Sequence, residues 1–433
     1  MNVLPVPDHF ARFISPQESE VSVEALPVDG AIPEWLTGTL LRNGPAYYGA
    51  GRGGARHLFD GLAMLHKFAF TDGRVSYANR FLRTRSYRAL REDGRIGYRE
   101  FASDPCRRLT LPIASLFDPG YSDNTNVNVI RLGARLVALT ETPLPIAFDP
   151  ETLETLGVAY DPPGRGVRSP TAHPHFDAAG SMITLQVHFG VRSSYRLYRH
   201  TPTGFRLLAR IPVRQPAYVH SFALTERHIV LAEAPFRIRP LELATARRPF
   251  IENYRWLPEQ GTTFLVVDRH TGRLTGRWQA GPMFCFHHVN AYDDPSGDIV
   301  VDLCAYEDPS IIDATYLDTL HEGRTPIPAG RLRRYRLRPG GATQEETVSP
   351  TPFEWPRVNY RAVNSRPYRY AYGAGTVHDG VPAPAITKLD LSDGSAIHWH
   401  DRDHHPGEPV FVPGPGRRGE DDGVLLSVVF DPA

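Results

Sequence analysis

The sequence lacks any excess of charge. Lysine plus arginine and aspartate plus glutamate number 48 each in 433 residues, and lysine occurs only at Lys67 and Lys388. Without net charge there is no general field to attract nucleic acid or to hold the chain strongly on an anionic membrane. Nucleic-acid binding is therefore a poor first hypothesis.

Cysteines and long apolar runs are also scarce. The three cysteines, Cys106, Cys285 and Cys304, form no CxxC pair, which argues against a disulfide framework and against a thiolate zinc site. No run approaches the roughly 20 apolar residues of a membrane-spanning helix, and the N-terminus has no apolar core of signal-peptide length. We expect a cytoplasmic protein that is soluble or binds a membrane peripherally.

The chain is instead rich in short β-type runs separated by turn residues, among them 40 prolines and 37 glycines. The runs are Leu136–Glu141, Met182–Phe189, Tyr195–His200, Ile229–Ala234, Thr263–Asp268 and Asp298–Tyr306. Helical periodicity is rare, as in Ser310–Leu320. This pattern predicts an all-β protein, a sandwich array, barrel or propeller. No linker is evident, so we expect a single domain over residues 1–433.

Two stretches depart from the strand pattern. Leu109–Phe117 carries Leu109, Leu111, Ile113, Leu116 and Phe117, and Phe236–Leu257 mixes apolar residues with arginines. One interpretation of the second stretch is a helical cap packed on the sheets. The other is an apolar, arginine-rimmed patch that enters a membrane surface to collect a lipophilic substrate.

Three histidines, His173, His220 and His287, lie in similar contexts with aromatic or β-branched neighbours. A single histidine of this kind is more often a core residue than a ligand, but three in matching contexts suggest one metal centre. Neutral imidazoles suit iron, zinc and copper, and they leave a bound Fe(II) its full charge.

A ligating imidazole usually donates its other N–H to a carboxylate or a carbonyl. Glu141 ends an apolar run, while Glu354 and Glu408 have aromatic and proline neighbours that favour burial. These three glutamates are candidate hydrogen-bond partners of the histidines. Spacing alone does not assign any of them to a particular histidine.

Together these segments resemble the carotenoid cleavage oxygenase family, from about Ile32 to the last residue. The motifs are Leu41-Arg42-Asn43-Gly44-Pro45, His57-Leu58-Phe59-Asp60-Gly61, Phe148-Asp149-Pro150-Glu151, Thr171-Ala172-His173-Pro174-His175, Tyr218-Val219-His220-Ser221-Phe222, Phe286-His287-His288-Val289-Asn290, Gly407-Glu408-Pro409-Val410-Phe411 and Glu420-Asp421-Asp422-Gly423. Ser103-Asp104-Pro105-Cys106-Arg107 and Tyr370-Ala371-Tyr372-Gly373 look like the animal-type branch, which holds the β-carotene oxygenases and the retinal pigment epithelium isomerohydrolase.

The resemblance implies a seven-bladed β-propeller that holds one Fe(II) on four histidines under a cap of loops and short helices. It identifies His173, His220 and His287 as ligands, His288 as a neighbour, and Glu141, Glu354 and Glu408 as the glutamates behind the ligands. Leu109, Leu111, Ile113, Leu116 and Phe117 become candidates for membrane contact at the tunnel entrance.

The C-terminus departs from the family pattern. The family places a fourth histidine in a Phe-His-Gly-like segment beyond Glu-Asp-Asp-Gly, and this chain stops at Ala433. His378, His398, His400, His404 and His405 lie late in the chain, but none is in a matching context, and 398–405 reads as a solvated loop. We therefore expect a truncated chain whose last blade is incomplete and whose metal binding is weakened.

The resemblance implies a non-haem Fe(II) dioxygenase that cleaves a C=C bond of a carotenoid or apocarotenoid with O2. One alternative is isomerohydrolase-like chemistry on a retinyl ester. A second is stilbenoid cleavage, which Thr140 disfavours because stilbenoid-cleaving members carry lysine beside the first of these glutamates. A third is an inactive carotenoid-binding protein that lacks the fourth ligand.

Overall fold

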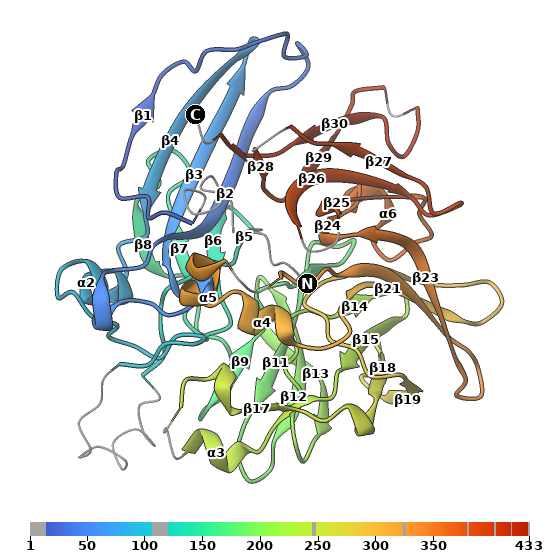
Figure 1. Ribbon diagram of the computed structural model, residues 1–433. Helices are drawn as coiled ribbons and strands as arrows, with labels where there is room; N and C mark the ends of the chain where they lie inside the picture. Colours follow the sequence, from blue (N-terminus) through green and yellow to red (C-terminus); the bar gives the residue numbers. More distant parts are fainter. Residues whose placement is uncertain are drawn as a thin grey trace. The chain divides into compact units, whose positions relative to one another are not determined.

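The computed structural model describes residues 14–105, 120–244, 248–323, 326–378, 381–401, 404–416 and 418–431. Antiparallel strands dominate these residues, and helices are short (Figure 1). The prediction of an all-β chain is therefore confirmed. In the described residues no helix has the length and apolar character needed to cross a membrane.

The chain divides into two compact units. Unit 2 comprises Pro16–Pro216 and Ile238–Tyr254, and unit 1 comprises the other described residues. The prediction of a single domain over residues 1–433 stays a prediction.

Unit 2 contains three antiparallel sheets, two of four strands and one of five. The first has the order β1-β4-β3-β2 and is formed by β1 (Ser22–Val23), β2 (Gly38–Tyr47), β3 (Leu62–Thr71) and β4 (Arg74–Phe81). The second runs β5 (Asn128–Leu132), β6 (Arg135–Leu139), β7 (Ile146–Phe148) and β8 (Thr155–Val158). The third is β9 (Arg168–Pro170), β10 (His175–Phe176), β11 (Met182–His188), β12 (Ser194–Thr201) and β13 (Gly204–Pro212), with β9 and β10 both paired to β11.

Unit 1 contains three further four-stranded sheets. They are β14 (Ala223–Leu224), β15 (His228–Glu233), β18 (Thr262–Asp268) and β19 (Leu274–Ala280); then β20 (His288–Asp293), β21 (Ile299–Ala305), β22 (Arg331–Leu337) and β23 (Thr343–Pro352); and last β24 (Glu354–Arg357), β25 (Tyr370–His378), β26 (Val381–Asp390) and β27 (Ala396–Trp399).

Three two-stranded sheets and several short helices complete the described fold. The sheets pair β16 (Phe236–Ile238) with β17 (Tyr254–Trp256), β28 (His405–Pro406) with β31 (Val429–Phe430), and β29 (Val410–Pro413) with β30 (Gly423–Leu426). The α-helices are α2 (Arg85–Arg91), α3 (Pro240–Ala244), α4 (Ser310–Ala314), α5 (Leu317–Glu322) and α6 (Tyr360–Val363), and the 3-10 helices are η1 (Gly51–Gly53), η2 (Leu58–Asp60), η4 (Ile251–Asn253) and η5 (Pro258–Gln260).

The expected number of seven blades is wrong, because the described residues form six blade-sized sheets, three in each unit. After β27 the strands have only two to four residues, and each pairs with a single partner, β28 with β31 and β29 with β30. Strands this short, each with one partner, do not assemble a seventh four-stranded sheet.

Inner strands of the sheets are covered on both of their faces. Every residue of β11 and of β21 is buried, and this includes the polar side chains of Gln186, His188 and Asp302. A tight turn links β3 to β4 through Asp72 and Gly73, whose φ angles of 50° and 72° belong to the left-handed region that Asp-Gly turns provide.

Neighbouring sheets within each unit share apolar cores. In unit 1, Cys304 and Leu332 of the β20–β23 sheet pack with Phe353, Ala371 and Leu389. This core lies directly beside Glu354, the first residue of β24. It therefore fixes the backbone on both sides of the candidate glutamate.

Candidate functional site

Ser221 joins two of the histidine segments in unit 1. Its hydroxyl donates to the carbonyl of Phe286 at 2.6 Å and accepts from the backbone N–H of His288 at 3.0 Å. Its oxygen also lies 2.8 Å from Nδ1 of His288. The segments around His220 and around His287 are thereby held side by side, although 65 residues separate Ser221 from Phe286.

The result is a close pair of imidazoles. The ring centroids of His220 and His287 are 5.0 Å apart and the rings are almost perpendicular, with Phe286 at 5.3 Å from His220. One imidazole nitrogen from each ring lies within 4.8 Å of the other. His220 is buried, and its Nδ1 lies 3.2 Å from the hydroxyl of Tyr218.

Glu354 holds His287 from behind. Its Oε2 is 2.9 Å from Nδ1 of His287, and it also accepts the backbone N–H of Trp355 at 2.6 Å. Burial acts to lower the pKa of His287, but the charge of Glu354 and the hydrogen bond to it outweigh burial, so the pKa is raised. An ionised carboxylate only accepts, so it selects the tautomer with the proton on Nδ1.

This donor set fits a divalent cation. Nδ1 of each imidazole is engaged on the side of Tyr218 or Glu354, so Nε2 is the nitrogen that would coordinate a metal in each case. Neutral imidazoles with a carboxylate behind one of them are typical of sites for iron or zinc.

The third candidate glutamate, Glu408, also lies near this pair. Its Oε1 is 2.7 Å from a guanidinium nitrogen of Arg357. The charge of Glu408 raises the pKa of His287, and the charge of Arg357 lowers it. Unit 1 therefore brings His220, His287, Glu354 and Glu408 into one neighbourhood.

His173 belongs to unit 2 and lies in the turn between β9 and β10. Its backbone N–H donates to Oγ1 of Thr171 at 3.0 Å, and the side chain of Asn128 donates to the carbonyl of Ala172 at 2.8 Å. Glu141 follows β6 in the same unit, where its carbonyl accepts from the hydroxyl of Ser169 at 3.0 Å. The turn carrying His173 is thus fixed through its backbone.

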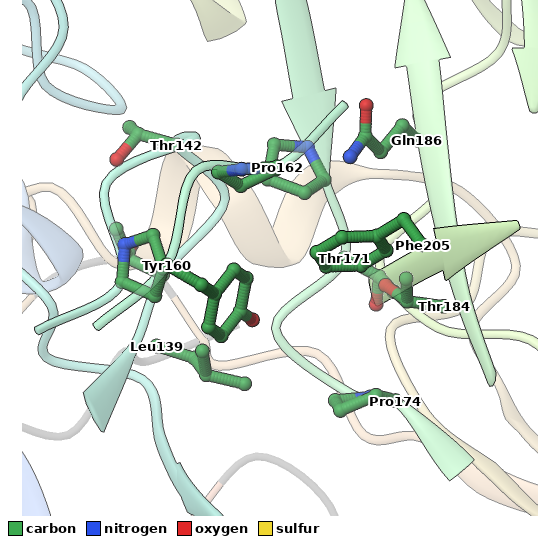
Figure 2. A pocket seen from close by; sticks show the side chains of 12 residues that line it. Leu139, Thr142, Tyr160, Pro162, Thr171, Pro174, Thr184, Gln186 and Phe205 are labelled. Atoms are coloured by element: carbon green, nitrogen blue, oxygen red, sulfur yellow. The ribbon is translucent and has the colours of Figure 1, made fainter. Parts of the chain in front are cut away.

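A small pocket of unit 2 lies against both of these segments (Figure 2). Its cavity volume is about 20 Å³, room for about one water molecule. Tyr160 and Phe205, whose ring centroids are 5.5 Å apart, both line it. The other lining residues are Leu139, Thr140, Thr142, Pro145, Pro162, Pro170, Thr171, Pro174, Thr184 and Gln186.

The model of the retinal pigment epithelial membrane protein family, RPE65, matches residues 14–433. The chain belongs to this carotenoid oxygenase family. A carotenoid isomerooxygenase from Galleria mellonella is 34% identical over 93% of this chain and 84% of its own length. The β,β-carotene 15,15'-dioxygenase of Mus musculus is 32% identical over 93% of this chain and 81% of its own length.

Solved structures agree with this assignment. A chimera of apocarotenoid oxygenase and RPE65 covers 98% of this chain and 91% of its own, with a TM-score of 0.84 and 28% identity. The cobalt-substituted apocarotenoid oxygenase of Synechocystis gives the same four values. The all-β propeller class predicted for this chain is confirmed, with six blades in place of seven.

Some of the predicted site residues lie outside the described residues. They are the membrane candidates Leu109, Leu111, Ile113, Leu116 and Phe117. The Phe236–Leu257 stretch forms β16, α3, η4 and β17, and its role as a cap stays a prediction. The expected solvated loop at 398–405 is partly wrong, because His405 lies in β28 and is only 3% exposed.

Sequence reasoning missed the residues that assemble the histidine pair. Tyr218 lies two positions before His220, and alternation along an extended segment would have placed both on one face. The bond from Ser221 to Phe286 and the pairing of Arg357 with Glu408 had no such signal. They depend on closeness of residues far apart in the sequence.

Proposed function

We propose that this chain is an Fe(II)-dependent oxygenase that cleaves a C=C bond of a carotenoid or apocarotenoid to two carbonyl products. The observation that carries the proposal is the imidazole pair of His220 and His287 backed by Glu354, in a member of the carotenoid oxygenase family. His173 is proposed as the third ligand, since each of these histidines can supply one imidazole nitrogen.

When bound, Fe(II) supplies the activation of O2 for addition across a double bond. The protein side chains hold the imidazoles in place: Ser221 fixes the two segments, and Glu354 keeps the proton of His287 on Nδ1. In the overall reaction both oxygen atoms of O2 end in the two carbonyl products, so no external reductant and no protein acid or base is required.

Relatives support the substrate class. The mouse relative is a β,β-carotene 15,15'-dioxygenase, and the Synechocystis structure is an apocarotenoid oxygenase whose metal has been exchanged for cobalt. A lipophilic polyene together with O2 is therefore the substrate pair that we propose for this chain. Neutral imidazole ligands are compatible with iron.

The test combines metal content with O2 uptake. Iron-loaded protein is incubated with β-carotene and with an apocarotenal in detergent, and we expect one O2 consumed for each pair of carbonyl products. His287→Ala should lose bound iron and product formation, whereas His270→Ala, at an exposed position of unit 1, should keep both. Stoichiometric iron with every polyene intact would refute the proposal, as would product formation without O2 uptake.

A second candidate comes from the relative in Galleria mellonella, which is a carotenoid isomerooxygenase. In that case a double bond changes geometry during cleavage. Chromatography of the aldehyde products against cis and trans standards distinguishes the two outcomes. Products that keep the geometry of the substrate would favour simple cleavage.

A further inference from the structure

β9 and β10 are two parts of one strand that pairs with β11 and is interrupted between them. Pro170 of β9 lies opposite Gln186, and His175 of β10 lies opposite Ile183. From Pro170 to His175 this strand advances five positions, whereas β11 advances only three between the two partner residues. The strand therefore contains a β-bulge at 171–174, with two residues more than the stretch that it faces.

The bulge takes His173 out of the regular pairing with β11. Thr171 still donates its backbone N–H to the carbonyl of Leu185 at 2.9 Å, so the extra residues come after Thr171. Pro174 has no N–H to donate, and a proline keeps the residue before it out of the right-handed helical region. Bulges often occur next to active sites, where they re-aim a side chain, and this bulge carries a histidine proposed above as a metal ligand.

Two side chains bind the backbone of the bulge. Oγ1 of Thr171 accepts the N–H of His173 at 3.0 Å, and Nδ2 of Asn128 donates to the carbonyl of Ala172 at 2.8 Å. This N–H and this carbonyl belong to one planar peptide unit, the one that leads into the Cα of His173. Ala172 is fully buried, and a buried carbonyl without a donor is costly. The peptide before His173 is therefore held at both of its polar ends.

Asn128 is itself fixed in place. It is the first residue of β5 and pairs with Leu139 in the second sheet of unit 2. Its Oδ1 accepts the backbone N–H of Val129 at 2.8 Å, so its amide group can only present N–H donors to the carbonyl of Ala172. Asn128 thus joins the second sheet of unit 2 to the bulge at the edge of the third.

Packing does not hold the bulge on every side. Thr171 and Pro174 both line the small pocket of unit 2 (Figure 2). A side chain that faces a cavity lacks the van der Waals contacts that would otherwise fix its position. The hydrogen bonds of Thr171 and Asn128 are therefore the contacts that set the course of the backbone through the bulge.

Resting on the metal centre proposed above, we propose that Asn128 and Thr171 are positioning residues that hold the peptide before His173 and so set the direction in which His173 presents its imidazole. Residues that orient a ligand in this way change metal affinity without touching the metal. Such a role acts only through His173, so it must disappear when the imidazole of His173 is removed.

The structure supplies matched controls for both positions. Asn79 is buried, and its side chain accepts the N–H of Val21 at 2.7 Å and donates to the carbonyl of Ser19 at 3.2 Å. Thr225 is fully buried, and its Oγ1 accepts the N–H of Arg227, two residues further on, at 3.2 Å. Removing these bonds perturbs the fold in the same way but leaves the bulge intact.

The experiment measures Co²⁺ binding to the metal-free full chain from the visible absorption of the ion. We expect Asn128→Asp, which replaces the donor by an acceptor, and Thr171→Val, which removes the hydroxyl, each to weaken Co²⁺ binding about 10-fold. Thr171→Ser keeps the hydroxyl and should retain most of the wild-type affinity. The controls Asn79→Asp and Thr225→Val should stay within about 2-fold of the wild type.

Two further measurements separate positioning from a general loss of structure. Unfolding of each metal-free variant is followed in parallel, and the comparison of Thr171→Val with Thr171→Ser decides the matter if Asn128→Asp does not fold. His173→Ala is then combined with Thr171→Val. Because residues that act through one ligand are not additive, the double variant should bind Co²⁺ within about 2-fold of His173→Ala alone.

The outcomes distinguish the two proposals. A selective loss in the Asn128 and Thr171 variants that disappears in the His173→Ala background supports the positioning role. Equal affinity in test and control variants, or a loss that adds to that of His173→Ala, overturns this role and leaves the metal centre standing. Unchanged affinity in His173→Ala overturns the assignment of His173 as a ligand, and absence of Co²⁺ binding by the wild type overturns the proposed centre; either result overturns the positioning role as well.

Discussion

Carboxyl groups with different neighbours occur in the two units. Glu354 of unit 1 faces an imidazole that can carry positive charge. Glu100 of unit 2 faces two other carboxyls, those of Asp60 and Asp123, and it accepts from the hydroxyl of Ser122 at 2.6 Å. Burial and the two neighbouring charges raise the pKa of Glu100 well above its usual range.

The difference shows how context gives one residue type two tasks. A carboxylate beside an imidazole is kept charged and directs the imidazole, which suits a metal site. Carboxyls beside each other favour the neutral form and act as hydrogen-bonding groups in the interior. We therefore expect substitutions in unit 2 to change stability and those at Glu354 to change metal binding.

Asp60 should give the largest effect. Its carboxylate accepts the N–H of Ala102 at 3.1 Å and the hydroxyl of Ser103 at 2.6 Å, and it is only 1% exposed. Asp60→Ala leaves those buried donors without an acceptor, so the free energy of unfolding should fall by about 3 kcal/mol. Denaturant unfolding measures this loss.

The control for Asp60 is a carboxylate that water already solvates. The side chain of Asp161 is 95% exposed and lies 3.8 Å from Arg168. Asp161→Ala should change the free energy of unfolding by less than about 0.5 kcal/mol. A similar loss in both variants would contradict the role given to burial.

Glu354→Gln tests the other side of the comparison. The amide keeps the shape of the side chain but removes the charge that favours Nδ1–H on His287. We expect Co²⁺ affinity to fall about 10-fold to 100-fold, roughly 1.4 to 2.7 kcal/mol, with a smaller change in the unfolding of the metal-free chain.

Glu346, an exposed residue of β23, provides the control for Glu354. Glu346→Gln should leave both Co²⁺ affinity and stability unchanged. If Glu354→Gln destabilised the metal-free chain as much as Asp60→Ala and left Co²⁺ affinity intact, the carboxyls of the two units would not differ in the way proposed.

The strands could be predicted from the sequence more closely than their assembly. The β-rich run Met182–Phe189 became β11, Met182–His188, all of whose residues are buried. The single helix expected over Ser310–Leu320 is two helices, α4 and α5. Between them Thr315 donates its hydroxyl to the carbonyl of Ile311 at 2.8 Å, a local bond that competes with helix continuation.

The number of blades and the contacts within the site could not be predicted from the sequence. Six blade-sized sheets rather than seven follow from how the short strands after β27 pair, which composition does not determine. Local sequence context made the histidines and glutamates candidates, and the resemblance to the family identified them as ligands and their partners. That Glu354 meets His287, 67 residues away, depends on tertiary packing, and spacing alone did not pair them.

The smallest effect concerns pH. Burial raises the pKa of Asp60 to about 6 and places that of Glu100 well above 4.5. Because both are raised, the folded state binds more protons than the unfolded state in this range, and stability falls as pH rises through the folded-state pKa values. The stabilising contribution of these carboxyls is complete only at acidic pH.

Glu100→Gln isolates one part of this dependence, because glutamine stays neutral at every pH. At pH 4 the variant should resemble the wild type, whose Glu100 is protonated there. As pH rises, the wild type must either ionise Glu100 beside Asp60 and Asp123 or keep its proton, so the variant should gain about 1 to 2 kcal/mol relative to it. Denaturant unfolding of both proteins between pH 4 and pH 8 measures that gain. A difference that does not vary with pH would mean that Glu100 titrates as an ordinary glutamate, and the contrast with Glu354 would then rest on Asp60 alone.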